Sequence, residues 1–386
     1  MRIGIDNISP GEATGRRGPG GMRLYLQSLL TEFSGHAPQH QFILFTPDWA
    51  DPIVDSLPAN VQVVGLPGVP MNRVQRIVYQ QIVLPFVVLR QKLDVFFATA
   101  TVAPLLSVVP VVLAVQFIQF YQWPGAYGRA RTAYLKVFLP LSLRKARRAI
   151  IFTETAKQDL VRWTGVPANK VSVVPHGLSQ DIWRLAQLRP DALEYKVGLS
   201  LTNGRPYFLY VSASYGYKNH SRLIQAFSVL KKRCRVPHIL LLVGSEEAVS
   251  FSKLRTVAAQ AGVADEVIFV GHLDPHERVS ATYLGADVAV IPSLYETFGF
   301  PALEAMACGC PVVTSNSGSM AELAGDAAVL VDPYDINSIA DGMERVLTDS
   351  TLRRRLVERG RERVKMYTWQ RSAEQTLRLL EEAARR

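Results

Sequence analysis

The stretch that decides the fold is Tyr295–Pro311, which reads YETFGFPALEAMACGCP. It places Glu296 in a glycine-containing turn and Glu304 eight residues later, where the residue pattern predicts a helix. Apolar runs typical of buried strands lie on both sides, at 286–293 and 311–315. The stretch therefore predicts a strand, a helix and a second strand, which is the unit that builds parallel α/β sheets.

The two glutamates of this unit are candidates for binding hydroxyl groups. Ligands of parallel α/β folds bind beyond the carboxyl ends of the strands, where the N–H groups of a helix start also favour anions. Glu304 is surrounded by alanine, leucine and methionine, where a carboxylate without a partner is costly. One of the two glutamates could therefore accept hydrogen bonds from the hydroxyls of a sugar, and the other from those of a ribose. A solvent-facing glutamate on a helix surface is the alternative interpretation.

This segment resembles the signature of the retaining glycosyltransferases of family four, in which two glutamates stand eight positions apart. The resemblance continues through 316–323 and 328–333, covers essentially the whole chain and is most specific between Tyr210 and Asp335. It implies the GT-B fold, an α/β architecture of two Rossmann-like, doubly wound parallel-sheet domains that face each other across a cleft. It also implies transfer of a hexose from a nucleoside-diphosphate sugar.

The order of predicted elements agrees with two such domains. Strand-like and helix-like segments alternate along the chain, which is typical of parallel sheets covered by helices. A chain of 386 residues also exceeds what one hydrophobic core usually organises. We expect an N-terminal acceptor-binding domain, a linker, a C-terminal nucleotide-sugar-binding domain and a last helix that, by resemblance, packs back on the first domain, at 1–178, 179–205, 206–366 and 367–386.

Two loops are expected to hold the donor diphosphate. Gly20 and Gly21 precede a predicted helix, where glycine lets the backbone approach a phosphate, although glycine-rich turns before helices are common. Lys218 follows the predicted strand 206–211, and the resemblance assigns its cation to the departing diphosphate. The other donor-binding residues that the resemblance implies lie in strand-end loops and at the helix start: Ser212, Gly271, His272, Leu273, Phe298, Gly299, Phe300 and Leu303.

The chain departs from the family pattern at two places. Gln116-Phe117 stands where many relatives have His-Asp, and Ser212-Ala213 stands where many relatives carry an arginine. A glutamine can hydrogen-bond a sugar hydroxyl but cannot carry a proton at neutral pH. Gln116 is therefore a candidate contact to the sugar or the acceptor. His176, in a Pro-His-Gly motif, is a second candidate contact, with interdomain packing as the alternative.

A basic and aromatic segment runs from Arg129 to Arg148 and suits an anionic membrane surface, with a solvated helix face as the alternative. No nucleic-acid-binding motif accompanies the net charge of +10, so nucleic acid is not an expected partner. The three cysteines, and an N-terminus that reads as a strand rather than a signal peptide, favour a cytoplasmic protein. Such a protein could bind peripherally to the inner face of the cell membrane through the basic segment.

The resemblance implies a retaining hexosyltransferase with Glu296 and Lys218 as its catalytic residues. In it Glu296 would hold the sugar hydroxyls, Glu304 the ribose and Lys218 the departing diphosphate. GDP-mannose is the preferred donor, because the chain resembles bacterial mannosyltransferases of surface polysaccharides such as lipopolysaccharide. The acceptor is expected to be a glycan or a polyprenyl-linked sugar. No Asp-x-Asp pair lies in the predicted cleft loops, so neither a metal nor another cofactor is expected. A sugar-nucleotide epimerase and a non-catalytic nucleotide-sugar-binding protein remain alternatives, and the oligomeric state stays open.

Overall fold

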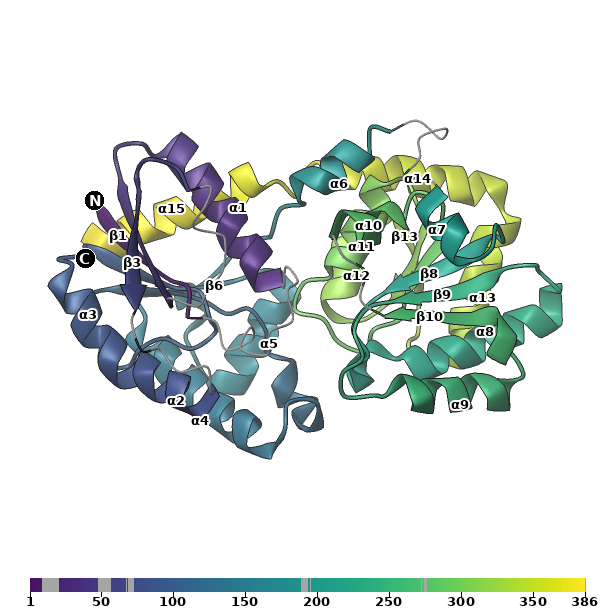
Figure 1. Cartoon of the computed structure of the whole chain (residues 1–386), viewed down its shortest axis with the longest axis horizontal. Helices are drawn as coiled ribbons and strands as arrows, with labels where there is room; N and C mark the ends of the chain where they lie inside the picture. Colours follow the sequence, from purple (N-terminus) through teal and green to yellow (C-terminus); the bar gives the residue numbers. More distant parts are fainter. Residues whose placement is uncertain are drawn as a thin grey trace. The chain divides into compact units, whose positions relative to one another are not determined.

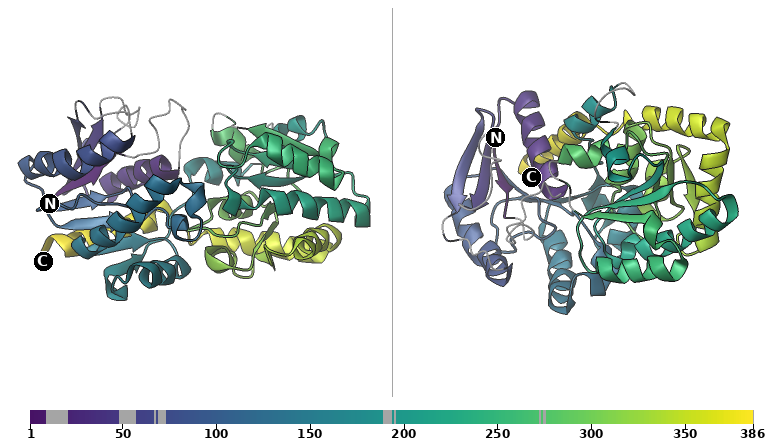
Figure 2. Two further views of the ribbon diagram at one scale, coloured as in Figure 1. Left: turned by 90° about the horizontal axis from the view of Figure 1, so that it is seen from below. Right: turned by 45° about the vertical axis from the view of Figure 1, so that its right-hand side comes forward.

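The computed structural model describes most of the chain: residues 1–8, 21–47, 57–66, 68, 73–188, 194, 196–271, 273 and 276–385. It forms two compact units (Figure 1), the first made of Met1–Gly177 with Thr368–Arg386 and the second of Leu178–Tyr367. Each unit contains one sheet in which all described strand pairs are parallel. Helices cover both sides of each sheet (Figure 2). The predicted class, two parallel-sheet α/β domains, is confirmed.

The sheet of the first unit has the order β3-β2-β1-β4-β5-β6-β7. Its central strands are buried along their length, as expected of parallel strands that are covered on both faces. The strands are β1 (Arg2–Asp6), β2 (Gln41–Pro47), β3 (Val61–Leu66), β4 (Val95–Ala98), β5 (Val111–Ala114), β6 (Arg148–Ile151) and β7 (Val171–Val173).

The described helices of the first unit include one helix from the far end of the chain. They are α1 (Gly21–His36), α2 (Arg73–Val78), the π-helical turn η2 (Tyr79–Val83), α3 (Leu84–Arg90), α4 (Arg129–Lys145), α5 (Glu154–Thr164) and α15 (Trp369–Arg385). The last of these, α15, packs against α1, β4, β5 and β6. It buries an apolar stripe that begins at Trp369 and includes Leu380, so this terminal helix completes the core of the first unit.

The sheet of the second unit has the order β10-β9-β8-β11-β12-β13. Its strand β9 reads ILLLV and is wholly buried, a continuous apolar run of the kind that parallel sheets contain. The strands are β8 (Tyr207–Val211), β9 (Ile239–Val243), β10 (Val267–Gly271), β11 (Val288–Ile291), β12 (Val312–Ser315) and β13 (Ala328–Val331). The helices are α6 (Gln180–Leu185), α7 (Lys196–Leu201), α8 (His220–Cys234), α9 (Phe251–Ala261), α10 (His276–Ala281), α11 (Phe300–Ala307), α12 (Gly318–Ala324), α13 (Ile336–Thr348) and α14 (Ser350–Val364).

The expected linker 179–205 is corrected by the structure. Its described residues include α6 and α7, and both helices pack on the second unit, α6 against α10 and α11 and α7 against α10. Ile182 and Leu185 of α6 are fully buried. Burial of these two side chains explains why this segment belongs to the second unit rather than acting as a free connection.

Among the described residues, no helix combines the length and the apolar character needed to cross a bilayer.

Candidate functional site

The second unit places its candidate site at the point where the strand order reverses. Strands β8 and β11 are neighbours, paired through Phe208 and Val288, and the chain continues from them toward opposite edges of the sheet. The loops that follow such neighbouring strands diverge and leave a ligand site at the carboxyl edge of the sheet. Here the loop after β8 carries Lys218 and the loop after β11 carries Glu296. The two predicted catalytic residues therefore come from the two sides of one switch point.

Lys218 and Glu296 contact each other directly. The Nζ atom of Lys218 lies 2.6 Å from Oε1 of Glu296, within hydrogen-bond distance. The two side chains are only 16% and 8% exposed. A charge pair this far removed from water is sensitive to the loss of either member, because the remaining charge would stay buried.

Three side chains fix the loop that carries Lys218. The Tyr210 hydroxyl donates to the carbonyl of Lys218 at 2.9 Å and lies 2.9 Å from Oγ of Ser293. Asn219 adopts the left-handed conformation at φ 66°, and its amide nitrogen donates to the carbonyls of Pro292 and Pro333. Asparagine tolerates this conformation better than most residues. These contacts join the Lys218 loop to the Glu296 loop.

The turn before α11 depends on a glycine. Gly299 has φ 131°, and a Cβ atom added there would lie 2.7 Å from Sδ of Met320. Such backbone angles are rarely adopted by L-residues other than glycine. Pro301 follows in the first turn of α11, a position that needs no N–H donor. The backbone near Phe298 and Phe300 is thereby set at the start of the helix that bears Leu303 and Glu304.

Glu304 is buried, with 7% exposure, and it has a partner that sequence reasoning missed. The Tyr283 hydroxyl donates to Oε2 of Glu304 at 3.1 Å. Burial, together with the Glu304 charge, raises the pKa of Tyr283 well above its ordinary value, so this hydroxyl keeps its proton. Tyr283, which lies in the segment before β11, thus gives the Glu304 carboxylate a hydrogen-bond partner among apolar residues.

The ends of β8, β9 and β10 approach closely at the same edge of the second sheet. Gly244, which follows β9, donates its N–H to the carbonyl of Gly271 at 2.8 Å, and a Cβ on Gly244 would lie 2.2 Å from the Ser212 carbonyl oxygen. Predicted donor residues Ser212 and Gly271 are therefore brought together around a glycine that the sequence did not single out. Leu273 is half-buried nearby in the chain, whereas His272 and Gly20 lie outside the described residues. The remaining glycine, Gly21, begins α1 in the first unit.

Next to Lys218 lies a histidine that stays neutral. His220 begins α8, is 5% exposed and packs its ring 4.9 Å from that of Tyr210. Burial, with a smaller contribution from the Lys218 charge, lowers the pKa of His220 to about 4. At neutral pH His220 therefore adds no charge beside Lys218, and its ring contributes packing.

Two family models match the chain. Residues 192–363 match the family described as "Glycosyl transferases group 1", and residues 19–181 match "Glycosyltransferase Family 4". The chain belongs to the group 1 glycosyltransferases. This membership confirms the resemblance that rests on the Glu296–Glu304 spacing.

Individual relatives agree with this family. The chain is 28% identical to the O-antigen chain mannosyltransferase B of Escherichia coli over 265 residues, which is 67% of each chain. It spans 54–60% of the length of six further curated relatives. Among solved structures, sucrose-phosphate synthase from Thermosynechococcus elongatus matches with a TM-score of 0.76 at 23% identity, covering 99% of this chain and 98% of that one. Anabaena HepE, solved in complex with UDP and glucose, matches with a TM-score of 0.74 at 18% identity, covering 99% and 100%. These likenesses confirm the GT-B fold.

In the first unit, Gln116 follows β5, and a hydrogen bond holds its backbone in place. Its N–H donates to Oγ1 of Thr101 at 3.1 Å, and Thr101 itself is buried with φ 70°. The side-chain nitrogen Nε2 of Gln116 is buried and has no hydrogen-bond partner within the described part of the chain. A buried hydrogen-bond donor without a partner costs free energy of folding. The Gln116 side-chain N–H is therefore available to a ligand oxygen.

The structure places His176, a candidate contact to the sugar or the acceptor, inside the first unit. It is 3% exposed and stacks on Phe152 with ring centroids 3.7 Å apart, with Tyr25 and Trp369 packed edge-on. Burial lowers its pKa to about 3, so the ring is neutral. The rings that pack against His176 all belong to the first unit, so its burial arises within that unit, and the contact to the sugar or the acceptor stays a prediction.

A buried carboxyl group that the sequence analysis did not single out lies at the switch point of the first sheet. Asp6 ends β1 and is fully buried. Its Oδ1 accepts a hydrogen bond from the Ile8 N–H at 2.8 Å, and its Oδ2 accepts one from Gln80 Nε2 at 3.1 Å. Burial raises the pKa of Asp6 to about 6, although both hydrogen bonds favour the charged form. The signal that could have found it is an aspartate that ends the strand directly after the apolar run Ile3–Ile5.

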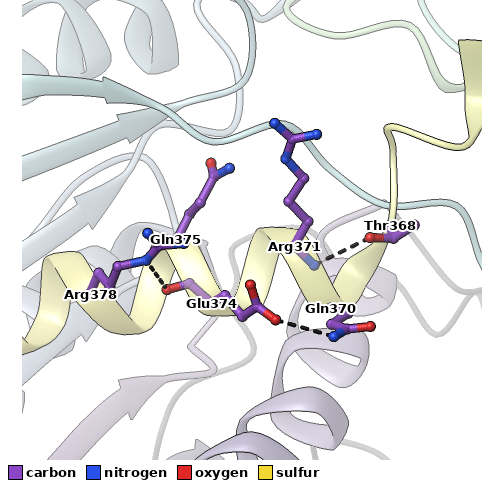
Figure 3. Close-up of a pocket in the computed structure, with 6 residues that line it drawn as sticks. All are labelled: Thr368, Gln370, Arg371, Glu374, Gln375 and Arg378. Carbon is purple, nitrogen blue, oxygen red and sulfur yellow. Dashed lines mark hydrogen bonds between the residues drawn. The ribbon is translucent and has the colours of Figure 1, made fainter.

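A polar hollow lies along α15 in the first unit (Figure 3). Its volume is about 620 Å³, and none of the predicted site residues lines it. The Gln370 amide donates to Oε1 of Glu374 at 3.2 Å within it. The lining residues all come from the first ten residues of this helix and the residue before it: Thr368, Gln370, Arg371, Glu374, Gln375 and Arg378.

No group of three or more His, Cys, Asp or Glu residues placed to hold a metal occurs within the described ranges.

Proposed function

We propose that the protein transfers a hexosyl group, with retention of the anomeric configuration, from a nucleoside-diphosphate sugar to an acceptor hydroxyl. The observation that carries the proposal is the 2.6 Å pair of Lys218 Nζ and Glu296 Oε1 at the switch point of the second sheet. Such an edge is where open α/β sheets bind their ligands. The pair supplies a cation for a leaving diphosphate and a carboxylate for sugar hydroxyls in one place.

In the proposed reaction, the bond between the anomeric carbon and the diphosphate oxygen breaks while the acceptor oxygen bonds to the same face of the sugar. Negative charge grows on the leaving oxygen, so Lys218 stabilises the transition state more than the bound donor. The leaving phosphate takes the proton of the acceptor hydroxyl. This route needs no protein base in the first unit, which suits Gln116, a side chain that cannot carry a proton. Because Lys218 supplies the positive charge, we propose that no divalent metal is required.

Binding of the donor divides between the two glutamates in this proposal. Glu296 accepts hydrogen bonds from the hexose hydroxyls and is drawn toward them from its contact with Lys218. Glu304 accepts the ribose hydroxyls with the carboxylate that Tyr283 already orients. Two hydroxyls on adjacent carbons of a ribose match the two oxygens of one carboxylate.

The choice of donor and acceptor rests on the relatives. Likeness to an O-antigen chain mannosyltransferase favours GDP-mannose, and the HepE complex with UDP and glucose makes UDP-glucose the competing donor. We propose a glycan or a polyprenyl-linked sugar of a surface polysaccharide as the acceptor.

A non-catalytic nucleotide-sugar-binding protein is the second candidate. Gln116 favours it, because its position lacks the histidine that many relatives have. Binding and transfer must therefore be measured separately. Thermal shift with a panel of nucleotide sugars identifies the donor, since a ligand at 100 times its Kd stabilises by about 2.7 kcal/mol.

Transfer is then measured with the nucleotide sugar that stabilises the protein, radiolabelled in its sugar. Short mannose oligosaccharides and polyprenyl-linked sugars serve as acceptors, and each reaction is run with and without EDTA. We expect labelled product with the donor anomeric configuration, and the same rate with EDTA. Donor stabilisation without transfer or hydrolysis would favour the binding protein. Release of an epimerised sugar without acceptor would identify an epimerase, and the absence of stabilisation by every nucleotide sugar would overturn the proposal.

A further inference from the structure

The net charge of the protein comes from one segment of the first unit. Residues 56–153 contain eleven lysines and arginines and a single acidic residue, Asp94. The whole chain carries a formal net charge of +10, so the rest of the sequence is balanced. A positive field is therefore concentrated on the elements from β3 to β6.

The helix formed by α2, η2 and α3 exposes apolar side chains where a solvent-facing helix would expose polar ones. Between residues 78 and 89, every exposed residue is apolar. Val78, Ile82, Phe86 and Leu89 are 50%, 52%, 60% and 53% exposed, and they recur at intervals of three or four residues. This spacing places them along one side of the helix.

The loop before β5 extends this apolar surface. Leu106 and Val108 are 61% and 71% exposed. The loop is tied to the helix by Gln81, whose Nε2 donates to the Ala103 carbonyl at 3.2 Å and whose Oε1 accepts from the Leu105 N–H at 3.0 Å. Together with Val78, Ile82, Phe86 and Leu89, these two residues form what we call the apolar face.

Basic residues flank the apolar face on two sides. Arg90 and Lys92 are exposed at the end of α3. On the other side, the Ala103 N–H donates to Oγ of Ser142 in α4, and the exposed Arg144 and Lys145 follow in the next turn. Figure 1 shows α2, α3 and α4 along one edge of the first unit. We call these four cations the basic rim.

The cations of the basic segment from Arg129 to Arg148 differ in their surroundings: some have partners within the protein, and others are exposed. Arg148 pairs with Glu382 at 3.2 Å, and Arg131 lies over the rings of Phe117 and Tyr127. Arg144 and Lys145 instead remain exposed at the end of α4. The rim residues are therefore better placed for an external anion than the middle or the end of the segment.

We propose that the apolar face inserts into the surface of a bilayer that contains anionic phospholipids, with the basic rim on the headgroups. An apolar helix face bordered by lysine and arginine is the arrangement that lies in a membrane interface. Anionic lipids complement the charge of residues 56–153. A second copy of the chain would instead place two basic rims against each other, which is unfavourable. The proposal goes beyond sugar transfer and does not depend on it.

Vesicle flotation of the full chain tests the proposal, with vesicles of phosphatidylcholine alone or mixed with phosphatidylglycerol. We expect the protein to bind the anionic vesicles and to bind them more weakly as salt is added. The reason is that the Debye length, over which charges interact, falls from about 10 Å at 0.1 M ionic strength to about 3 Å at 1 M. The double variants Ile82→Ser/Phe86→Ser and Arg144→Glu/Lys145→Glu should each lower the partition coefficient about tenfold or more.

Matched controls lie on the second unit. Leu330→Ser/Met366→Ser removes two exposed apolar side chains there, and Arg354→Glu/Arg355→Glu makes the same charge change on α14. Both controls should bind as the parent does, and thermal melts verify that all variants fold. Equal binding to neutral and anionic vesicles, or no binding by the parent, would overturn the proposal. A parent dimer that Ile82→Ser/Phe86→Ser dissociates without changing vesicle binding would assign the face to self-association instead.

Discussion

Lys218, which is partly buried, and the buried Glu296 form a pair 2.6 Å apart between the loops that follow the neighbouring strands β8 and β11. Tyr210 and Asn219 connect the two loops: the Tyr210 hydroxyl bonds to the Lys218 carbonyl and to Oγ of Ser293, and the Asn219 amide donates to the Pro292 carbonyl. A donor diphosphate would have to draw the ammonium group partly away from its carboxylate. Donor binding and the geometry of the two loops are therefore expected to change together.

Replacing Lys218 with alanine should reduce turnover roughly a hundredfold or more, the size typical of losing one electrostatic stabiliser. The reason is that its cation matters most when charge develops on the leaving phosphate, so kcat should fall more than donor affinity. Steady-state kinetics with saturating acceptor measure the first quantity, and calorimetry with the donor measures the second.

The control for this prediction is Lys218→Arg, which keeps the charge but not its shape and should recover only part of the rate. Lys218→Ala also leaves Glu296 buried without its ammonium partner, so a lower melting temperature is expected. Transfer by Lys218→Ala at the parent rate would remove this lysine from the proposed chemistry.

Glu304→Ala should weaken donor binding by about 1–3 kcal/mol, as for loss of hydrogen bonds to a charged group. The physical reason is the loss of a carboxylate held for ribose hydroxyls. Tyr283→Phe is the matched variant, because it removes the 3.1 Å bond to Glu304 but keeps the carboxylate. Calorimetry should show a much smaller loss for Tyr283→Phe. Equal losses, or none for Glu304→Ala, would mean that Glu304 serves the packing of α11 rather than the donor.

Local sequence patterns predicted the fold and the paired glutamates because their signals lie within short windows. The alternation of apolar strands and helices and the Glu296–Glu304 spacing are of this kind. Contacts between distant residues left no such signal. Tyr283 was not foreseen as the partner of Glu304, nor Gln80 as the partner of Asp6, since both pairings follow from the sheet order.

Burial was also hard to predict from residue type alone. The apolar residues of α6 were assigned to a linker, yet they are buried in the second unit. Phe86 and Leu89 have the same apolar character, yet they are exposed in the first unit. An apolar sequence thus indicates which side chains favour burial. Whether they are buried within the protein depends on the helices and strands that pack beside them.

Gly299→Ala should lower the free energy of unfolding by roughly 1–3 kcal/mol, because alanine would have to adopt φ 131°. The added Cβ would also lie 2.7 Å from Sδ of Met320. Urea denaturation measures the loss, and donor affinity should fall with it, since this turn sets the start of α11. The double variant Gly299→Ala/Met320→Ala relieves the contact but not the backbone angle, so it should not restore donor affinity. Full restoration by that double variant would show that the contact alone requires the glycine.

The pH dependence of stability should contain a contribution from Asp6. Burial raises the pKa of Asp6 from 3.8 to about 6, so the folded protein binds more protons than the unfolded chain between these values. The free energy of unfolding therefore falls as pH rises through this window, by about 3 kcal/mol in total from this group, since one pKa unit is worth about 1.4 kcal/mol.

Asp6→Asn removes the titration while its amide oxygen can still accept the bond from the Ile8 N–H. Urea denaturation at pH 4, 5, 6 and 7 should show the variant gaining stability relative to the parent as pH rises. The gain should level off between pH 6 and pH 7, because the folded parent is about half ionised at Asp6 at pH 6 and mostly ionised at pH 7. Glu154→Gln changes an exposed carboxyl group of the same unit and should show no such trend. A stability difference between parent and Asp6→Asn that stays constant from pH 4 to pH 7 would mean that Asp6 does not titrate in this window.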